Sequence, residues 1–407
     1  MSCGRSAPRN HPCISQQTPP CFIWSISVNA QLVSGGPSDL VHINTPTAPS
    51  VAKIVPVTID SDTSVDDVTL LKKHSLDKSP VVSAELKKDD GPLFPFYYPH
   101  FDNTEKFPPT EIFEHVDAGS RADPAKPHLL ANATTKNLTP YIGIEIKGVQ
   151  ISQLNQEGLD ELALYAAERK VLVFRDQDFK DLGHDRQVEI AKHFGPIQLH
   201  PTSDNVKGYP EFHVAQSVRG SNRLSKTQWH SDVTYEKQPS CTTFFFSLEQ
   251  PPNSGGDTLF ASQVEAYNRL SPGFQQRLEG LRAVHSAVHQ ADFSRKRNGP
   301  VRREPIETSH PVVRKHPVTG EKALFVNPGF TRYIEGYKQE ESDNLLRFLF
   351  DHIARGADFQ IRATYKPNTV VVWDNRVTVR SATNDFPSKL RRHAVRLTPQ
   401  GEIPVPA

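Results

Sequence analysis

The feature that most constrains the fold is a series of short β-branched and aromatic runs, separated by long connections. These runs are CTTFFFSLEQ, DTLFAS, KALFVN, FQIRATY, TVVVWDN and HAVRLTP. Each has the length and the residue types of a β-strand. Many strands of this length joined by long loops are typical of a sandwich or an open barrel. We therefore predict a mainly β fold with flanking helices.

Four stretches have the spacing of amphipathic helices. They are Leu159–Lys170, His184–Gly195, a segment around Pro272–Ser286, and Lys338–Arg355. In the second, the closing glycine occupies the C-cap position. The run VLVFRDQ, which follows the first helix, predicts a buried strand. We expect the early helices to pack outside the sheet.

Composition divides the chain of 407 residues into three parts. Residues 1–90 are rich in Pro, Ser, Thr and Asp, and such segments bury too little apolar surface to offset chain entropy, which predicts a disordered leader. Residues 91–137 begin with an aromatic, proline-rich stretch, and we expect an extended arm there because proline interrupts helices. Residues 138–407 are predicted to form one domain.

The charge balance excludes several classes of partner. Lys and Arg number 47 against 46 Asp and Glu, so the net charge of +1 favours neither nucleic acid nor strongly basic partners.

No apolar run approaches the roughly 20 residues of a membrane helix. The four cysteines form no zinc-type pair, which favours a reducing, cytoplasmic location. Arg5 and Arg9 among serines leave an organelle transit peptide as the alternative.

The stretch TQWHSDVTYEK places His230 and Asp232 two residues apart. Side chains at this spacing point to the same side of an extended segment, so an imidazole and a carboxylate converge on one point. That pair suits a divalent first-row metal ion. A following SGGDTLF segment supplies the glycines that a tight turn between strands needs.

A second group of candidate residues lies in LRRHAVRLTP. In a strand, Arg392, Ala394 and Arg396 share one face, and His393 and Val395 share the other. Two guanidinium groups on one face repel each other unless anions lie beside them. Because the planar fork of arginine binds carboxylates or sulfonates through two hydrogen bonds, we interpret this face as part of an anion pocket.

Several ordered motifs together resemble a known family. WHSDVTYEKQPSCTTFFFSLEQPPNSGGDTLFASQVEAYNRLSP, VVVWDNRVT and RRHAVRLTP are similar to the taurine dioxygenase (TauD/TfdA-type) family of iron(II)- and 2-oxoglutarate-dependent dioxygenases. FGPIQLHPTS and VLVFRDQDF agree with it. Within the family, the chain most resembles the fungal sulfonate dioxygenases. The resemblance runs from about Leu138 to Pro404.

The resemblance implies a double-stranded β-helix, or jelly roll, that holds Fe(II) through two histidines and one carboxylate. His230 and Asp232 match the first two ligands. Thr258 and Arg392 match the residues that bind the distal carboxylate of 2-oxoglutarate. Arg396 matches the arginine that receives the anionic group of the substrate.

His200, in LHPTS, matches a histidine on the substrate side. The implied function is hydroxylation of a small anionic substrate, an alkyl sulfonate first, with release of sulfite and an aldehyde. The implied partners are this substrate, 2-oxoglutarate and O2, and family members also commonly self-associate. The alternative is a tailoring oxygenase of a secondary-metabolite pathway, in which Arg396 binds a carboxylate of the substrate.

One position departs from the family pattern. The third iron ligand should be a histidine shortly after WDNRVT, but the chain continues with Val379 and Arg380. Arginine cannot ligate a metal ion, because it stays protonated and has no acceptor lone pair.

Several explanations of this departure stay open at this stage. Arg380 could swing outward, and iron could be held by His230, Asp232, 2-oxoglutarate and water. His393 could substitute, although strand alternation places it on the face opposite Arg392. The protein could also be catalytically silent and retain only anion binding. A sequencing or strain-specific change would be the fourth explanation.

Overall fold

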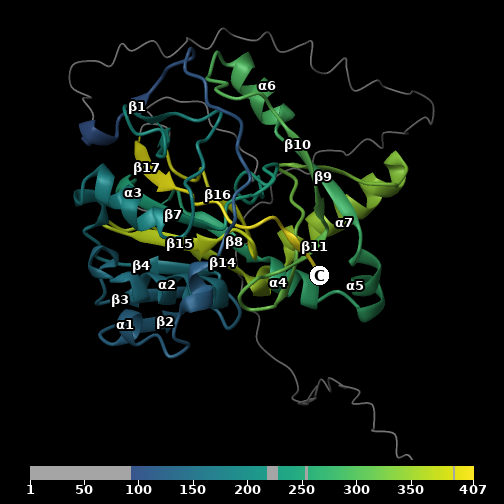
Figure 1. The fold of residues 1–407 in the computed structure, drawn as a ribbon, viewed down its shortest axis with the longest axis horizontal. Coiled ribbons are helices and arrows are strands. Elements are labelled where there is room, and N and C mark those ends of the chain that lie inside the picture. Colours follow the sequence, from purple (N-terminus) through teal and green to yellow (C-terminus); the bar gives the residue numbers. More distant parts are fainter. Residues whose placement is uncertain (1–92, 218–227, 253–254, 388–389) are drawn as a thin grey trace, which may run out of the picture. The chain divides into compact units, whose positions relative to one another are not determined.

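The computed structural model describes residues 93–217, 228–252, 255–387 and 390–407. The predicted leader at residues 1–90 therefore lies outside the described residues. In the described part, one seven-stranded sheet dominates, with the strand order β2-β3-β4-β15-β7-β17-β6 (Figure 1). Its strands are β2 (Thr134–Asn137), β3 (Ile144–Lys147), β4 (Val171–Phe174), β6 (His213–Ser217), β7 (Thr242–Glu249), β15 (Val370–Asp374) and β17 (Arg392–Leu397). Strands β3 and β4 are parallel, and the other neighbours are antiparallel.

The outer face of this sheet packs against helices. Helices α2 (Gln156–Arg169) and α3 (His184–Lys192) share one buried apolar cluster with Phe244, Phe246 and Val395 of the sheet. Each phenylalanine that leaves water entirely in such a cluster contributes about 1.5–3 kcal/mol. The two predicted early helices thus cover the sheet from outside, as expected from the sequence.

The inner face of the large sheet packs against a three-stranded sheet with the order β14-β8-β16. Its strands are β8 (Thr258–Ser262), β14 (Gln360–Ala363) and β16 (Thr378–Ala382). Phe245, Trp373 and Ala394 of the large sheet share a second cluster with Phe260 of β8. Because successive residues of a strand point to opposite faces, the strands in the middle of the large sheet bury one set of side chains outside and one inside.

A further part of the chain adds smaller sheets and helices beside the two main sheets. The three-stranded sheets have the orders β10-β9-β13 and β12-β11-β18, and β1 pairs with β5. These strands are β1 (Pro99–His100), β5 (Asn205–Val206), β9 (Arg282–Ser286), β10 (Glu307–Pro311), β11 (Val313–Lys315), β12 (Lys322–Leu324), β13 (Thr331–Ile334) and β18 (Val405–Pro406). The other helices are α1 (Pro127–Leu130), α4 (Gln263–Asn268), α5 (Pro272–Leu278), α6 (Val288–Lys296) and α7 (Gln339–Arg355).

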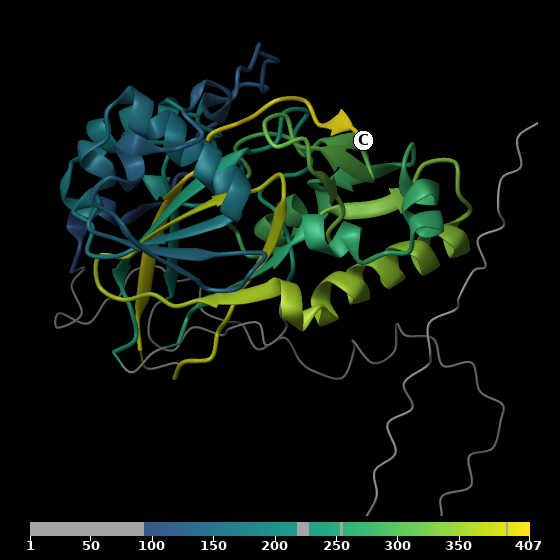
Figure 2. The ribbon, with the colours of Figure 1, turned by 90° about the horizontal axis from the view of Figure 1, so that it is seen from below.

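Figure 2 shows α7 leading into β14, an outer strand of the three-stranded sheet. This helix matches the predicted helix at Lys338–Arg355 to within one residue. None of the helices in the described part of the chain combines the length and the apolar character needed to cross a bilayer.

Residues 93–137 contain little regular structure and contact the main body at specific points. Tyr97 is buried in the outer cluster and donates its hydroxyl to the carbonyl of Lys180 at 2.6 Å. The backbone carbonyl of Tyr97 contacts Nε2 of His393 at 3.0 Å. His393 therefore lies on the outer face of β17, as the strand alternation predicted.

Two local predictions were wrong in detail. The predicted helix around Pro272–Ser286 ends at Leu278, and Gly280, with φ +83°, reverses the chain into β9, which pairs with both β10 and β13. Helix α3 ends at Lys192, so Gly195 is not its C-cap. A Cβ atom on Gly195 would lie 2.2 Å from the carbonyl oxygen of Gln400, and this close backbone approach is the reason for glycine there.

A buried ion network anchors the turn after β15. The guanidinium of Arg376 contacts both carboxylate oxygens of Asp374, at 2.6–3.2 Å, and also pairs with Asp117 and Glu402. His316 contacts Asp374 from the other side at 3.0 Å. The network ties residues from the beginning, the middle and the end of the described chain to the turn that precedes β16.

We expect Arg376→Met to lower the free energy of unfolding by about 3–5 kcal/mol, because it leaves buried carboxylates without their cation. Urea unfolding of the full chain measures this change. Arg355→Met is the control, since the 3.2 Å pair of Arg355 with Asp351 is exposed and contributes less than about 1 kcal/mol. Equal losses in the two variants would contradict the assigned role of the network.

Candidate functional site

The predicted metal-site residues lie next to each other beside the middle of β16. His230 and Arg380 form an antiparallel bridge, with N–O distances of 3.0 Å and 2.8 Å between their backbones. Residues directly opposite in such a pair project their side chains to the same side. Position 380 is therefore where a third ligand would join His230, and it holds an arginine.

The carboxylate of Asp232 is the centre of the site. Its Oδ1 atom accepts a hydrogen bond from Nη2 of Arg380 at 2.6 Å and lies 3.1 Å from Nη1 of Arg396. The same Oδ1 atom lies 3.9 Å from Nε2 of His230. The Asp232 side chain is only 2% exposed. One buried carboxylate oxygen thus faces two guanidinium groups and an imidazole.

Neutral side chains hold this carboxylate in place. Thr243 on β7 donates its hydroxyl to Oδ2 of Asp232 at 3.1 Å. Asn375 donates Nδ2 to the Thr243 hydroxyl at 2.8 Å and accepts from Nε1 of Trp373 at 2.9 Å. The orientation of Asp232 therefore depends on β7 and on the turn after β15.

Burial and the arginines determine the charge states of the site. Burial opposes ionisation of Asp232, but Arg380 and Arg396 outweigh it and hold the pKa of the carboxyl below its usual range. Burial and then Arg380 lower the pKa of His230 to about 4. Burial and then Arg396 lower the pKa of His200 to about 3. Near pH 7 the histidines are neutral, so two arginines against one aspartate leave an excess of one positive charge.

Arg396 lies between the site and a pair of histidines. It pairs with His213 across β17 and β6, and the ring of His213 lies 4.6 Å from the ring of His200. Burial lowers the pKa of Arg396 to about 10, and the Asp232 carboxylate opposes that shift. Within the described residues, Nε of Arg396 and Nδ1 of His213 have no hydrogen-bond partner. Donor and acceptor capacity therefore remains here for a ligand.

Arg392 and Thr258 lie around one tyrosine. The Thr258 hydroxyl is 2.8 Å from the hydroxyl of Tyr365, and the Arg392 guanidinium lies 5.7 Å from the centre of the Tyr365 ring. Arg392 also donates Nε to the carbonyl of Gly256 at 2.9 Å. A Cβ atom on Gly256 would lie 2.8 Å from Cδ of Arg392, so only glycine allows this approach.

Three aromatic rings lie between the guanidinium of Arg392 and that of Arg380. We call these rings, Tyr365, Phe245 and Trp373, the aromatic row. Phe245 lies 5.0 Å from Tyr365 and 6.2 Å from Trp373, measured between ring centres. The Arg392 guanidinium lies over Phe245 and Tyr365, and the Arg380 guanidinium lies 5.0 Å from the Trp373 ring centre. Cations thus lie over opposite ends of the row, held by contacts with the ring faces.

The side chains present do not fit a three-ligand iron site. His230 and Asp232 supply two donors, and the third position supplies a cation that cannot ligate. Two unit charges about 4 Å apart interact by about 4 kcal/mol at an effective dielectric constant of about 20, and a dication doubles that repulsion. A metal ion at Asp232 would therefore have to displace Arg380. His393 does not replace the missing ligand, because it contacts the Tyr97 carbonyl on the outer face.

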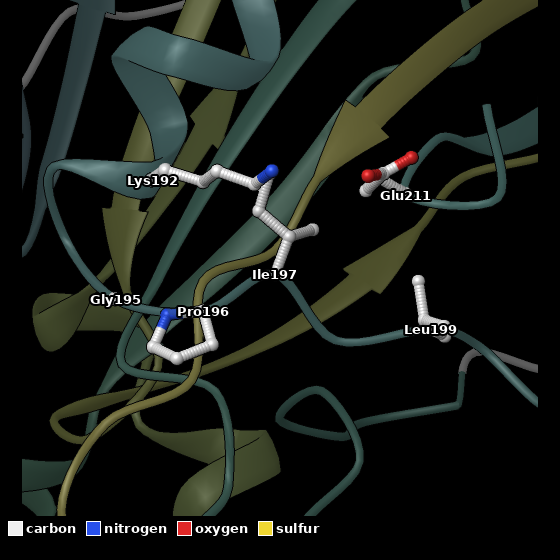
Figure 3. A pocket seen from close by; sticks show the side chains of 6 residues that line it. All are labelled: Lys192, Gly195, Pro196, Ile197, Leu199 and Glu211. Atoms are coloured by element: carbon white, nitrogen blue, oxygen red, sulfur yellow. The ribbon is translucent and has the colours of Figure 1, made fainter. Parts of the chain in front are cut away.

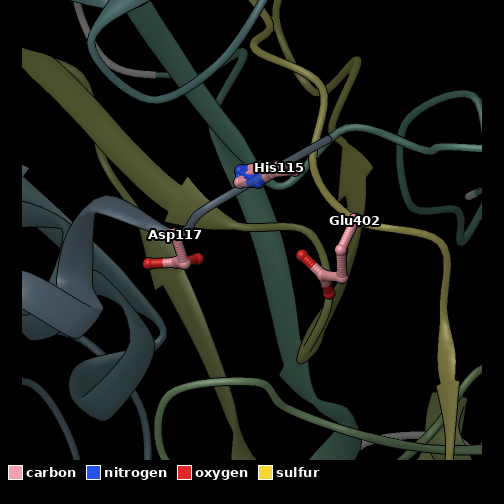
Figure 4. A group of neighbouring side chains, drawn as sticks. All are labelled: His115, Asp117 and Glu402. Carbon is pink, nitrogen blue, oxygen red and sulfur yellow. The ribbon is translucent and has the colours of Figure 1, made fainter. Parts of the chain in front are cut away.

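One group of acidic and histidine side chains among the described residues has ligand atoms close enough for a metal ion: His115, Asp117 and Glu402 (Figure 4). Arg376 pairs with both of its carboxylates, and Arg314 pairs with Glu402. The group belongs to the buried ion network described above, and these arginines already balance its charge.

An open pocket of about 570 Å³ lies elsewhere (Figure 3). Its lining is mainly apolar and comprises Lys192, Gly195, Pro196, Ile197, Leu199 and Glu211. This lining includes none of the residues that the sequence predicted for the site. We assign it no role in chemistry.

The functional roles assigned from the sequence stay predictions, and that assignment missed several side chains around the predicted residues. The predicted residues are Asp232, His230, Arg392, Arg396, Thr258 and His200. The missed side chains are Thr243, His213, Trp373, Asn375 and Tyr365. A strand-face argument could have found Thr243, because it shares a face with Phe245. His213 and Tyr365 required the pairing of strands far apart in the sequence.

Known proteins of one enzyme class are similar to this chain. The model of the family described as "Taurine catabolism dioxygenase TauD, TfdA family" matches residues 134–398. The α-ketoglutarate-dependent dioxygenase cnsM of Penicillium expansum is 49% identical over 336 residues, covering 80% of this chain and 94% of that protein. An α-ketoglutarate-dependent sulfonate dioxygenase of Saccharomyces cerevisiae is 41% identical over 325 residues, covering 77% and 79%.

A solved structure is also similar. The crystal structure of a putative α-ketoglutarate-dependent taurine dioxygenase from Burkholderia xenovorans has a TM-score of 0.57 and 31% sequence identity. The match covers 67% of this chain and 94% of that one.

We expect a double-mutant cycle of Asp232→Asn and Arg380→Met to give a coupling free energy of about 2 kcal/mol in unfolding, because the two side chains form a buried, charged hydrogen bond. Urea unfolding of the natural chain, both single variants and the double variant measures it. The exposed pair of Arg295 and Asp292, at 3.0 Å, is the matched control and should couple by less than about 1 kcal/mol. A coupling near zero at the site would mean that Arg380 points away from Asp232 in solution.

Proposed function

The chain belongs to the TauD, TfdA family of taurine catabolism dioxygenases, and from that premise we propose that its site binds 2-oxoglutarate beside a small anionic substrate, with alkyl sulfonates as the first candidate class. Membership confirms the predicted family and the predicted enzyme class of α-ketoglutarate-dependent dioxygenases. Fe(II) and 2-oxoglutarate are the cofactor and co-substrate of that family. The single observation that carries the proposal is the placement of Arg392 and Arg396 on the inner face of β17.

The 2-oxoglutarate half of the proposal rests on Arg392 and Thr258. A guanidinium fork and a hydroxyl beside it suit the distal carboxylate of a dicarboxylic acid. The contact between Arg392 and the Gly256 carbonyl orients the guanidinium, and Tyr365 orients the threonine hydroxyl. Both groups are therefore positioned by contacts that are present without a ligand.

The substrate half rests on Arg396 and His200. Arg396 has an Nε–H group without a partner among the described residues, and His200 lies one ring contact away through His213. A sulfonate suits such a site because it stays anionic and offers three acceptor oxygens. Its charge also balances the excess positive charge around Asp232.

For this pair of ligands we propose hydroxylation of the carbon next to sulfur, a reaction that would proceed only with iron bound at Asp232 in place of Arg380. One oxygen atom of O2 enters the substrate, and the other enters succinate as 2-oxoglutarate loses carbon dioxide. The hydroxylated carbon then loses sulfite and becomes an aldehyde. The protein's own contribution is to hold the C–H bond near the reacting centre and to exclude water. The chemistry itself requires iron, which the residues around Asp232 do not accommodate as they stand.

Two alternatives have specific support. A carboxylate substrate of a tailoring oxygenase suits Arg396 equally well, because a guanidinium binds a carboxylate through two hydrogen bonds as it binds a sulfonate. A catalytically silent protein that retains anion binding is favoured by the ion pair between Asp232 and Arg380.

The fold we propose is a double-stranded β-helix made of the seven-stranded sheet and the β14-β8-β16 sheet. Support comes from the aromatic cluster shared by their facing sides and from the similarity to a family member of known structure. We also propose that residues 138–407 form the catalytic domain and that residues 91–137 are an arm attached to it, the end of which forms β2 at the edge of the large sheet.

We expect Arg392→Ala to weaken 2-oxoglutarate binding by about ten-fold or more. Arg396→Ala should weaken binding of an alkyl sulfonate by a similar factor. Each substitution removes a guanidinium that binds its anion through charge-assisted hydrogen bonds. Calorimetric titration of the full chain without oxygen measures both affinities. Each variant is the control for the other, since each should affect mainly its own ligand. Alkyl carboxylates of the same chain length test the alternative. Stronger binding of the carboxylates would favour the tailoring oxygenase.

A further inference from the structure

We infer that Arg380 is a permanent cation of this site, which takes the place of the metal ion and allows 2-oxoglutarate to bind without iron. The inference rests on the 2-oxoglutarate site proposed above and adds how the keto-acid end of that ligand is held. It concerns the chain as its sequence stands, with arginine at the third ligand position.

Arg380 is held in place from three directions. The backbone bridge to His230 determines where its side chain starts. The ring of Trp373 supports the guanidinium on one side, and Asp232 receives one of its nitrogens. The side chain is only 8% exposed. A guanidinium with these contacts is a fixed part of the site, because moving away would break the contacts with both Trp373 and Asp232.

The ion pair uses the oxygen atom that a metal ion would need. Oδ1 of Asp232 is the oxygen that faces Nε2 of His230, so a shared metal ion would have to bind there. First-row divalent ions lie about 2.0–2.2 Å from carboxylate oxygens. Nη2 of Arg380 already lies 2.6 Å from that oxygen. The metal ion and the guanidinium therefore exclude each other.

The remaining donor capacity of Arg380 points to an anion. Its Nε atom is buried and has no hydrogen-bond partner among the described residues, and the same is true of Nε of Arg396. In the part of the chain that the structure describes, one carboxylate, that of Asp232, pairs with both guanidinium groups. A second carboxylate at Arg380 would satisfy the free donor and balance the excess charge.

The aromatic row explains why the anion should be a dicarboxylate. Arg380 lies over the Trp373 end of the row, and Arg392 lies over the Phe245–Tyr365 end. A ligand with a carboxylate at each end places one at each cation and its methylene groups above the rings. We assign the distal carboxylate of 2-oxoglutarate to Arg392 and its keto-acid end to Arg380.

The first arm of the test uses the natural full-length chain without substitution. The protein is treated with EDTA and titrated with 2-oxoglutarate in the absence of oxygen, with and without added Mn(II). Because coupling between two ligands is reciprocal, a metal-independent site predicts that Mn(II) changes the affinity by less than about two-fold. Electron paramagnetic resonance should likewise show no Mn(II) binding that depends on 2-oxoglutarate.

The second arm compares Arg380→His with Arg380→Leu. Arg380→His supplies a third ligand and removes the competing charge, so Mn(II) affinity should rise by about 100-fold and 2-oxoglutarate binding should become metal-dependent. Arg380→Leu supplies neither ligand nor charge, so 2-oxoglutarate affinity should fall by about ten-fold or more. Arg175→His is the matched control for an added histidine. Arg175 is also paired with a carboxylate, that of Glu145, and its side chain is 7% exposed. It directly follows β4 and lies outside the site.

The outcomes separate this inference from the proposed function. Metal-dependent 2-oxoglutarate binding in the natural chain would overturn the inference, whether or not Arg380→His folds. Unchanged 2-oxoglutarate affinity in Arg380→Leu would overturn the assignment of the keto-acid end. Both proposals would be supported if the natural chain binds 2-oxoglutarate independently of metal and Arg392→Ala no longer binds it. If Arg392→Ala has no effect, the 2-oxoglutarate site itself is wrong.

Discussion

Strands β7, β15 and β17 are largely buried on both faces, and this constraint positions the site residues that they carry. These residues are Thr243, Trp373, Arg392 and Arg396. Phe244 and Phe246 pack outward against helices, which forces Phe245 inward toward the second sheet. The same alternation sends Val395 outward and Ala394 inward. A shift of one residue in β17 would place Arg392 and Arg396 on the helix-packed face, and burying a charged group without a partner is costly. The apolar residues thus hold the polar ones in register.

The site between these strands consists of fixed charged side chains, Asp232, Arg380 and Arg396, and not of a complete set of metal ligands. Asp232 is shared by two guanidinium groups and oriented by the Thr243 hydroxyl. Such a cluster is stable only because every charge has a partner or a ring face beside it, since isolated buried charges are costly. The family builds its site around a dication at this point. Here the cation is a side chain, delivered by the strand pairing of position 380 with position 230.

The contrast between Arg376 and Arg380 shows how context decides the role of a buried arginine. Both lie in one short segment after β15, and both contact buried aspartates. Arg376 is surrounded by carboxylates, so its charge is fully used within the protein. Within the described ranges, Arg380 shares its one carboxylate with Arg396, and its Nε atom has no hydrogen-bond partner. The first is a structural element, and the second has capacity for a ligand.

The sequence by itself determined the strand runs, the early helices, the family and the residues of its motifs, because these depend on local periodicity and on ordered residue types. It also showed that position 380 holds an arginine. It could not determine that Gly280 ends the predicted helix and begins β9, because pairing with β10 and β13 overrides the local preference. Nor could it show that Arg380 points to Asp232 instead of outward. That choice depends on the bridge to His230, the ring of Trp373 and the burial of Asp232, which only the tertiary structure brings together.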